Sequence, residues 1–177
     1  RSTLFPYTTL FRSTNRDGNG PFAADVLAQL QTVFSRMEQP LTLRLFLDDR
    51  PISAELRDYM TKLASLTEKL VVEETVGTEE TPCVRVYRAD GSPTGLAFHG
   101  VPGGHEFTSF VLGLYNASGP GQPLADEERA RIEKIEKDIH ITILVSLTCT
   151  MCPELVTSAQ RVAVGRSEER RVGKECR

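Results

Sequence analysis

The segment Leu41-Thr42-Leu43-Arg44-Leu45-Phe46-Leu47, followed directly by Asp48-Asp49-Arg50-Pro51, decides the fold of this chain. Leucine occupies every second position from 41 to 47, which is the period of a β-strand that buries one face. Proline at position 51 favours the first turn of a helix, and the acidic pair Asp48-Asp49 is expected to cap that helix. The segment therefore predicts a strand, a short turn and a helix in immediate succession.

The sequence on both sides of this segment completes one α/β unit. An amphipathic helix precedes the strand, and a long crossover helix reaches from Ile52 towards Leu70. A short strand over residues 71–74 follows, then a hairpin of residues 83–87 and 96–99, then a helix after Gly104. Parallel strands need such a crossover, whereas the last two strands pair through a turn. This order predicts a thioredoxin-like fold, in which Pro82 is a candidate cis-proline with a structural role.

The same pattern starts again 98 residues further along the chain. A charged helix over residues 124–137 precedes a second alternating strand over residues 139–145, whose apolar positions repeat those of residues 41–47. The segment 119–123, rich in glycine and proline, is the predicted linker between the copies. We therefore predict an α/β protein with tandem thioredoxin-like folds. The first, over residues 14–120, is complete, and the second, over 121–164, stops after its first strand and active-site helix.

The two copies differ at the turn that follows the strand. Cys149 and Cys152 stand where the first copy has Arg50 and Ser53, so the first fold is predicted to be redox-silent. Two thiols in a Cys-x-x-Cys spacing before a helix form a redox dithiol, because the helix N-terminus favours a thiolate and the second thiol resolves a mixed disulfide. The alternatives are half of a zinc site or two inert buried thiols. A structural zinc site needs four ligands, and no second Cys-x-x-Cys or histidine pair is present, so no metal site is predicted. Cys83 is expected to be a small buried apolar residue.

The two ends of the chain are related through the genetic code. Residues 166–177 can be written as codons whose reverse complement encodes residues 2–13, position for position. We interpret residues 1–13 and 165–177 as adapter-like artefacts and the sequence between them as a fragment of a longer protein. Without these ends, 14 basic and 21 acidic side chains remain, a net charge of −7 in place of −3. This acidity argues against nucleic acid as a partner. The few cysteines, and the absence of a signal peptide or a membrane-spanning run, indicate a cytoplasmic protein with no membrane partner.

Two runs carry a family resemblance: Gly100-Val101-Pro102-Gly103-Gly104-His105-Glu106-Phe107-Thr108-Ser109-Phe110-Val111-Leu112 and Ser146-Leu147-Thr148-Cys149-Thr150-Met151-Cys152-Pro153. Together with the tandem copies, they closely resemble the N-terminal region of the F subunit of alkyl hydroperoxide reductase. The resemblance implies an oxidoreductase whose second fold alone is redox-active. It implies a dithiol–disulfide electron relay from a module that binds FAD and NADH to a peroxiredoxin, in the response to reactive oxygen species. The chain has no Gly-x-Gly-x-x-Gly, so no cofactor is expected in this fragment, and FAD and NADH belong to the full-length flavoprotein.

The resemblance also implies roles for individual residues. Cys149 would attack the peroxiredoxin disulfide, Cys152 would resolve the mixed disulfide, and Glu106 would approach from the first fold as a candidate proton acceptor. An acid at a helix start is equally expected from the helix dipole alone, so that interpretation of Glu106 stays open. The implied partners are the peroxiredoxin of the same reductase system, a downstream flavin domain of the same chain, and a second copy in a homodimer. The alternative function for this fragment is a redox-inactive docking or scaffold domain.

Overall fold

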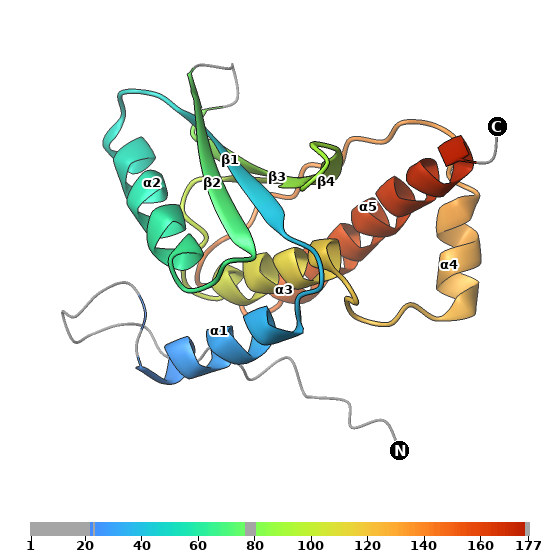
Figure 1. The fold of residues 1–177 in the computed structure, drawn as a ribbon, viewed down its shortest axis with the longest axis horizontal. Helices are drawn as coiled ribbons and strands as arrows, with labels where there is room; N and C mark the ends of the chain where they lie inside the picture. Colours follow the sequence, from blue (N-terminus) through green and yellow to red (C-terminus); the bar gives the residue numbers. More distant parts are fainter. Residues whose placement is uncertain (1–21, 23, 77–80, 176–177) are drawn as a thin grey trace.

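The structure is a computed structural model, and it describes residues 22, 24–76 and 81–175; the predicted adapter-like segment 1–13 lies outside the described residues. A four-stranded sheet of order β2-β1-β3-β4 lies against a layer of helices (Figure 1). The elements, in chain order, are α1 (Ala24–Arg36), β1 (Leu41–Leu47), α2 (Pro51–Ala64), β2 (Leu70–Val76), β3 (Cys83–Arg88), β4 (Pro93–His99), α3 (Glu106–Ser118), α4 (Asp126–Glu133) and α5 (Cys152–Glu175).

Strand β1 occupies the middle of the sheet, as its leucine alternation predicts. It pairs in parallel with β2, where Leu41 lies opposite Leu70, and antiparallel with β3, where Leu41 lies opposite Arg88. Helix α2 makes the crossover between the two parallel strands, and β3 and β4 form the antiparallel hairpin. The predicted order of a helix, a βαβ unit and a ββα unit is therefore confirmed.

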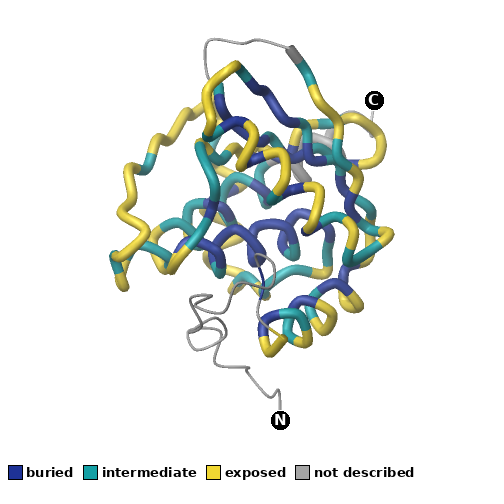
Figure 2. Tube along the Cα trace, turned by 90° about the vertical axis from the view of Figure 1, so that its left-hand side faces the viewer, coloured by how far each residue is buried: buried dark blue, intermediate teal, exposed yellow. Residues whose placement is uncertain are grey.

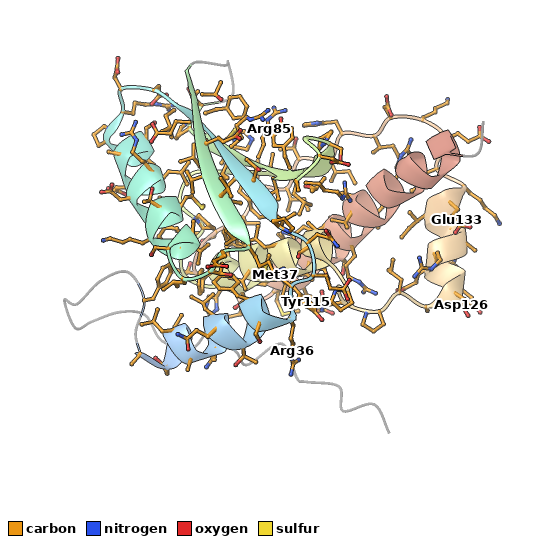
Figure 3. The ribbon with its side chains drawn as sticks, in the orientation of Figure 1. Arg36, Met37, Arg85, Tyr115, Asp126 and Glu133 are labelled. Atoms are coloured by element: carbon orange, nitrogen blue, oxygen red, sulfur yellow. A yellow bond between two sulfur atoms is a disulfide. The ribbon has the colours of Figure 1, made fainter. Side chains whose placement is uncertain are left out.

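The sheet has one buried, apolar face and one face that carries charged side chains. The alternating leucines of β1 are buried with apolar residues of α1, α2 and α3 in one core, and Figure 2 shows the dark blue of buried residues gathered on the central strands and helices. On the opposite face, Arg44 donates to Glu73 at 3.0 Å and stacks on the Tyr87 ring at 4.3 Å. Arg85, labelled on the sheet in Figure 3, lies over the ring of Phe46. The helices therefore cover a single face of the sheet.

The strand predicted for the second copy is absent from the structure. Residues 139–145 form no strand; they join α4 to α5 as an extended trace, drawn in orange in Figure 1. Ile139 and Ile141 are 60% and 59% exposed, and Leu144 is 93% exposed. A strand needs a neighbour to satisfy its backbone amides and carbonyls, and no strand of the described residues pairs with this run. Its alternation is the same as that of β1, but the pairing that turns alternation into a strand is missing.

The bounds of three predicted elements also shift. The charged helix predicted over residues 124–137 is the shorter α4, which the backbone leaves at Lys134. The predicted short strand over residues 71–74 extends over the whole of β2, in register with all seven residues of β1. The predicted crossover helix stops at Ala64, so Leu70 lies in β2.

Helix α5 of the second copy packs against α3 and β4 of the first copy. The side chain of Gln160 lies against Gly113 of α3, and Ala163 lies against Gly95 of β4. Val164 is buried and belongs to the same core as the β1 leucines. Glycine at both contact points lets the helix approach closely, so the dithiol helix docks on the complete fold. Among the described residues, no helix has the length and apolarity needed to cross a bilayer.

Two leucine-to-alanine substitutions test this division between the core and the exposed run. Leu43 is fully buried, so Leu43→Ala should lower the free energy of unfolding by about 2–5 kcal/mol. Leu144→Ala makes the same chemical change at an exposed side chain and should cost less than about 0.5 kcal/mol. Urea denaturation followed by circular dichroism measures both, and equal losses would contradict the burial described here.

Candidate dithiol site

Cys149 and Cys152 lie at the junction between the extended run and helix α5. They form a disulfide with their Cα atoms 5.6 Å apart, and both residues are half-buried. The backbone N–H of Cys152 donates to Cys149 Sγ at 3.2 Å. The backbone N–H of Cys149 donates to the carbonyl of Ser146 at 2.9 Å, which closes a turn in front of the helix. The structure therefore brings the two predicted thiols together at a helix N-terminus.

This geometry supports thiol chemistry. The first N–H groups of a helix have no partner inside the helix, and the dipole places positive potential at the same end. A thiolate that forms at Cys149 on reduction is stabilised there, and the thiolate is the nucleophile in disulfide exchange. The described residues contain no cluster of three histidine, cysteine or acidic side chains that could hold a metal ion.

The first turn of α3 lies beside this site and carries the predicted Glu106. The N–H of His105, which caps α3, donates to the carbonyl of Leu147, two residues before Cys149. Glu106 is only 6% exposed, and its Oε2 accepts a hydrogen bond of 2.5 Å from Ser109 Oγ. Its other oxygen, Oε1, is buried without a hydrogen-bond partner among the described residues. A carboxylate with one unused oxygen thus sits in the turn that holds the dithiol loop.

The corresponding position of the first fold holds a network of hydrogen bonds around Asp48. Helix α2 begins at Pro51 with Arg50 as its N-cap, so the prediction that the acidic pair caps this helix is wrong. Asp48 instead accepts from Ser53 Oγ at 2.6 Å and from Thr81 Oγ1 at 2.8 Å, and it forms an ion pair with Arg50 at 2.5 Å. Hydrogen bonds from Arg50, Ser53 and Thr81 hold the pKa of Asp48 well below its usual range.

The network also reaches the proline singled out in the sequence. The Thr81–Pro82 peptide bond is cis, and the Arg50 guanidinium donates to the Thr81 carbonyl. Cys83 follows Pro82 and is fully buried, which raises the pKa of its thiol. Where the second copy has two sulfur atoms, the first copy therefore has an arginine and a serine that bind their own fold.

Sequence reasoning missed two contacts at these sites. The bond between Thr81 and Asp48 joins residues 33 positions apart, and the contact of Leu147 with Gly104 and His105 joins two different copies. Neither contact has a periodic pattern in the sequence. The adjacent glycines 103 and 104 were the one available signal, because a glycine pair often marks a close backbone approach.

A thioredoxin-like sheet with a Cys-x-x-Cys disulfide at a helix N-terminus defines a dithiol–disulfide oxidoreductase fold. A solved structure, the NTD_N/C domain of alkylhydroperoxide reductase AhpF from Enterococcus faecalis (V583), matches with a TM-score of 0.73 and 34% identity, over 81% of this chain and 74% of that one. The chain belongs to this family, the N-terminal domain of the F subunit of alkyl hydroperoxide reductase.

Curated relatives give the same assignment. The chain is 33% identical over 141 residues to the F subunit of alkyl hydroperoxide reductase from Pseudomonas putida. It is 32% identical over 141 residues to a Bacillus subtilis (strain 168) protein named NADH dehydrogenase. Each alignment covers 80% of this chain and 27% of the relative, so the chain spans about a quarter of their length. No family model matches the chain.

The Asp48 network predicts a pH-dependent contribution to stability. Because the pKa of Asp48 is lowered in the folded state, its contribution is present above the ordinary carboxyl pKa of 3.8 and is lost as the pH falls towards the folded value. Asp48→Asn should therefore lower the thermal midpoint at pH 7, and the difference from the unsubstituted chain should shrink below about pH 4. Asp49→Asn, at the exposed neighbour, is the matched control, and a difference independent of pH would contradict the ionic network.

Proposed function

We propose that Cys149 and Cys152 relay electrons, by dithiol–disulfide exchange, from a reductase module that binds FAD and NADH to a peroxiredoxin. The observation that carries this proposal is the disulfide at the start of α5, with the Cys152 N–H directed at Cys149 Sγ. The membership of the chain in the family supports it. The parent protein would then act as an NADH-dependent oxidoreductase in peroxide defence.

The transfer takes place in two exchange steps. In the reduced chain, the Cys149 thiolate attacks one sulfur of the peroxiredoxin disulfide, forms a mixed disulfide and releases the other sulfur as a thiolate. The Cys152 thiolate then attacks Cys149 Sγ, which forms the Cys149–Cys152 disulfide and releases the second peroxiredoxin thiolate. The peroxiredoxin gains two electrons, and its thiolates take up protons from solvent. A dithiol of the reductase module reverses the oxidation of this chain by the same exchange.

The reductase module would lie outside this chain. The chain contains no Gly-x-Gly-x-x-Gly to cradle a dinucleotide, so its residues do not fit FAD or NADH. The relatives are about four times as long as the aligned region, and one of them is named NADH dehydrogenase, which supports a nicotinamide as the electron source. We place the relay in the cytoplasm, where thiols are kept reduced, and in a homodimer of the full-length flavoprotein.

Glu106 is the proposed proton acceptor for this exchange. Its Oε1 is buried and unpaired among the described residues, and Ser109 fixes the other oxygen. A helix cap would point its carboxylate at backbone N–H groups, whereas this carboxylate binds a side-chain hydroxyl. A proton acceptor near the dithiol would help to form the second thiolate, that of Cys152, when the mixed disulfide is resolved.

Serine substitutions of the two cysteines test the relay. The dithiothreitol-reduced chain, freed of reductant, should reduce a peroxiredoxin disulfide in equimolar amount, as measured by free-thiol titration and non-reducing electrophoresis. Cys149→Ser should abolish the transfer because the thiolate that attacks the peroxiredoxin disulfide is lost, whereas Cys152→Ser should trap a mixed disulfide through Cys149. Cys83→Ala is the control and should transfer normally, because Cys83 is buried away from solvent. Transfer at the normal rate by Cys149→Ser would refute the relay.

A neutral substitution tests Glu106 in the same assay. Glu106→Gln keeps the shape of the side chain and removes its capacity to accept a proton, so resolution of the mixed disulfide should slow by about 100-fold or more. The slowing should be largest at low pH, where the Cys152 thiolate is scarce, and should diminish as the pH rises. Glu127→Gln on the exposed face of α4 is the matched control. An unchanged rate with Glu106→Gln would leave only a structural role for the carboxylate.

A docking or scaffold domain is the second candidate function for this chain. The exposed and unpaired residues 139–145 favour it, because the dithiol helix follows a run that lacks the support of a sheet. The same mixing experiment separates the two functions. A scaffold would bind the peroxiredoxin without any change in the thiol count of either protein. A relay would remove two free thiols from this chain and create two on the peroxiredoxin.

A further inference from the structure

We propose that Gly104, in the redox-silent first fold, is a positioning residue for the dithiol loop of the second copy and thereby sets the reactivity of Cys149. This inference rests on the proposed dithiol function and goes beyond it, because it assigns a role in that function to a residue with no reactive group. It follows from three structural observations at the start of α3.

The first observation is a backbone hydrogen bond between the two copies. The N–H of His105 donates to the Leu147 carbonyl at 3.2 Å. The side chain of Leu147 is exposed, so this loop is held through its backbone. The N–H belongs to the N-cap of α3, a place where unpaired donors gather and favour an acceptor.

The second observation is the space that Gly104 leaves for that carbonyl. A Cβ atom at position 104 would lie 2.5 Å from the Leu147 carbonyl oxygen and 3.4 Å from the Leu147 Cβ. The distance to the Leu147 carbonyl oxygen is far shorter than van der Waals contact. Neither the added Cβ atom nor this oxygen could move away without a shift of the backbone. Gly104 also has a φ of +56°, in the left-handed region that favours glycine. Any other residue here would push the Leu147 loop away.

The third observation is the short path from that carbonyl to the reactive sulfur. The carbonyl of Ser146, which precedes Leu147, accepts the N–H of Cys149 at 2.9 Å. Cys149 Sγ in turn lies 3.2 Å from the backbone nitrogen of Cys152 at the start of α5. A displaced Leu147 would move this turn and lengthen the contact between Cys149 Sγ and the helix N-terminus. The thiolate of Cys149 would lose stabilisation, and its pKa would rise.

Alanine at position 104 tests the proposal on the full 177-residue chain in its reduced form. The rate of Cys149 alkylation by iodoacetamide is measured against pH, with the site resolved by peptide mass spectrometry. Gly104→Ala should move the midpoint of the profile to higher pH. Below the midpoint, alkylation should slow by about 3- to 10-fold, the change in thiolate fraction that half to one pKa unit gives. The titratable neighbours on the two helices, His105, Glu106 and Glu154, are unchanged in this variant, so the shift reports on the loop.

The neighbouring glycines supply two matched controls. Gly100 has a φ of +81°, but a Cβ atom added there would meet nothing within 4 Å, so Gly100→Ala carries the backbone strain without the contact. Gly103 has neither a positive φ nor a contact. Both variants should keep the alkylation profile of the unsubstituted chain, although Gly100→Ala should be less stable. A profile that shifts equally in Gly100→Ala and Gly104→Ala would overturn the proposal, because strain alone would then explain it.

A second measurement needs no variant and covers the case in which Gly104→Ala does not fold. In the unsubstituted chain, hydrogen exchange at the His105 amide should be slower than at the exposed amides of residues 139–145. Exchange as fast as theirs would show that the loop is not held and would overturn the proposal. An unshifted profile in a folded Gly104→Ala chain would do the same. Both measurements read Cys149 and its loop directly, so failure of transfer to a peroxiredoxin would refute the relay without affecting this result.

Discussion

The leucine row of β1 packs against three helices at once and pairs through its backbone on both sides. Leu41, Leu43 and Leu45 are essentially inaccessible to solvent, and they belong to one core with residues of α1, α2 and α3. Parallel pairing with β2 fixes the crossover of α2, and antiparallel pairing with β3 places Pro82 beside the start of α2. Helix α5 joins the same core through Val164, so the position of the dithiol depends on a strand about 100 residues away.

Much of this fold could be predicted from local patterns. The strand at residues 41–47, the hairpin and the helix that begins at Glu106 follow from apolar spacing and from turn residues, which act over a few positions. The run at residues 139–145 has the same alternation and yet forms no strand. Alternation shows which face a strand would bury, but a strand forms only where a neighbour supplies hydrogen bonds. The sequence pattern therefore shows the face to be buried, but it does not show whether a neighbouring strand is present.

The site divides in the same way. The Cys-x-x-Cys spacing before a helix predicts the dithiol and its helix N-terminus, because both depend on adjacent residues. The contacts that surround it are long-range: Leu147 meets the turn before α3, and Thr81 meets Asp48. The two copies thus differ in the residues that precede the helix. In the first copy, an ion pair and hydroxyl groups bind this turn to its own fold, and in the second copy, the turn carries the half-buried disulfide.

The exposed run of residues 139–145 also affects the thermodynamics of unfolding. The heat capacity change of unfolding reflects the apolar surface that passes from the folded core into water. Side chains such as Leu144 are already in water in the folded chain, so unfolding adds little of their surface. The slope of stability against denaturant depends on the same newly exposed area. The heat capacity change of unfolding measured by calorimetry should therefore be smaller than a chain of 177 residues would ordinarily give.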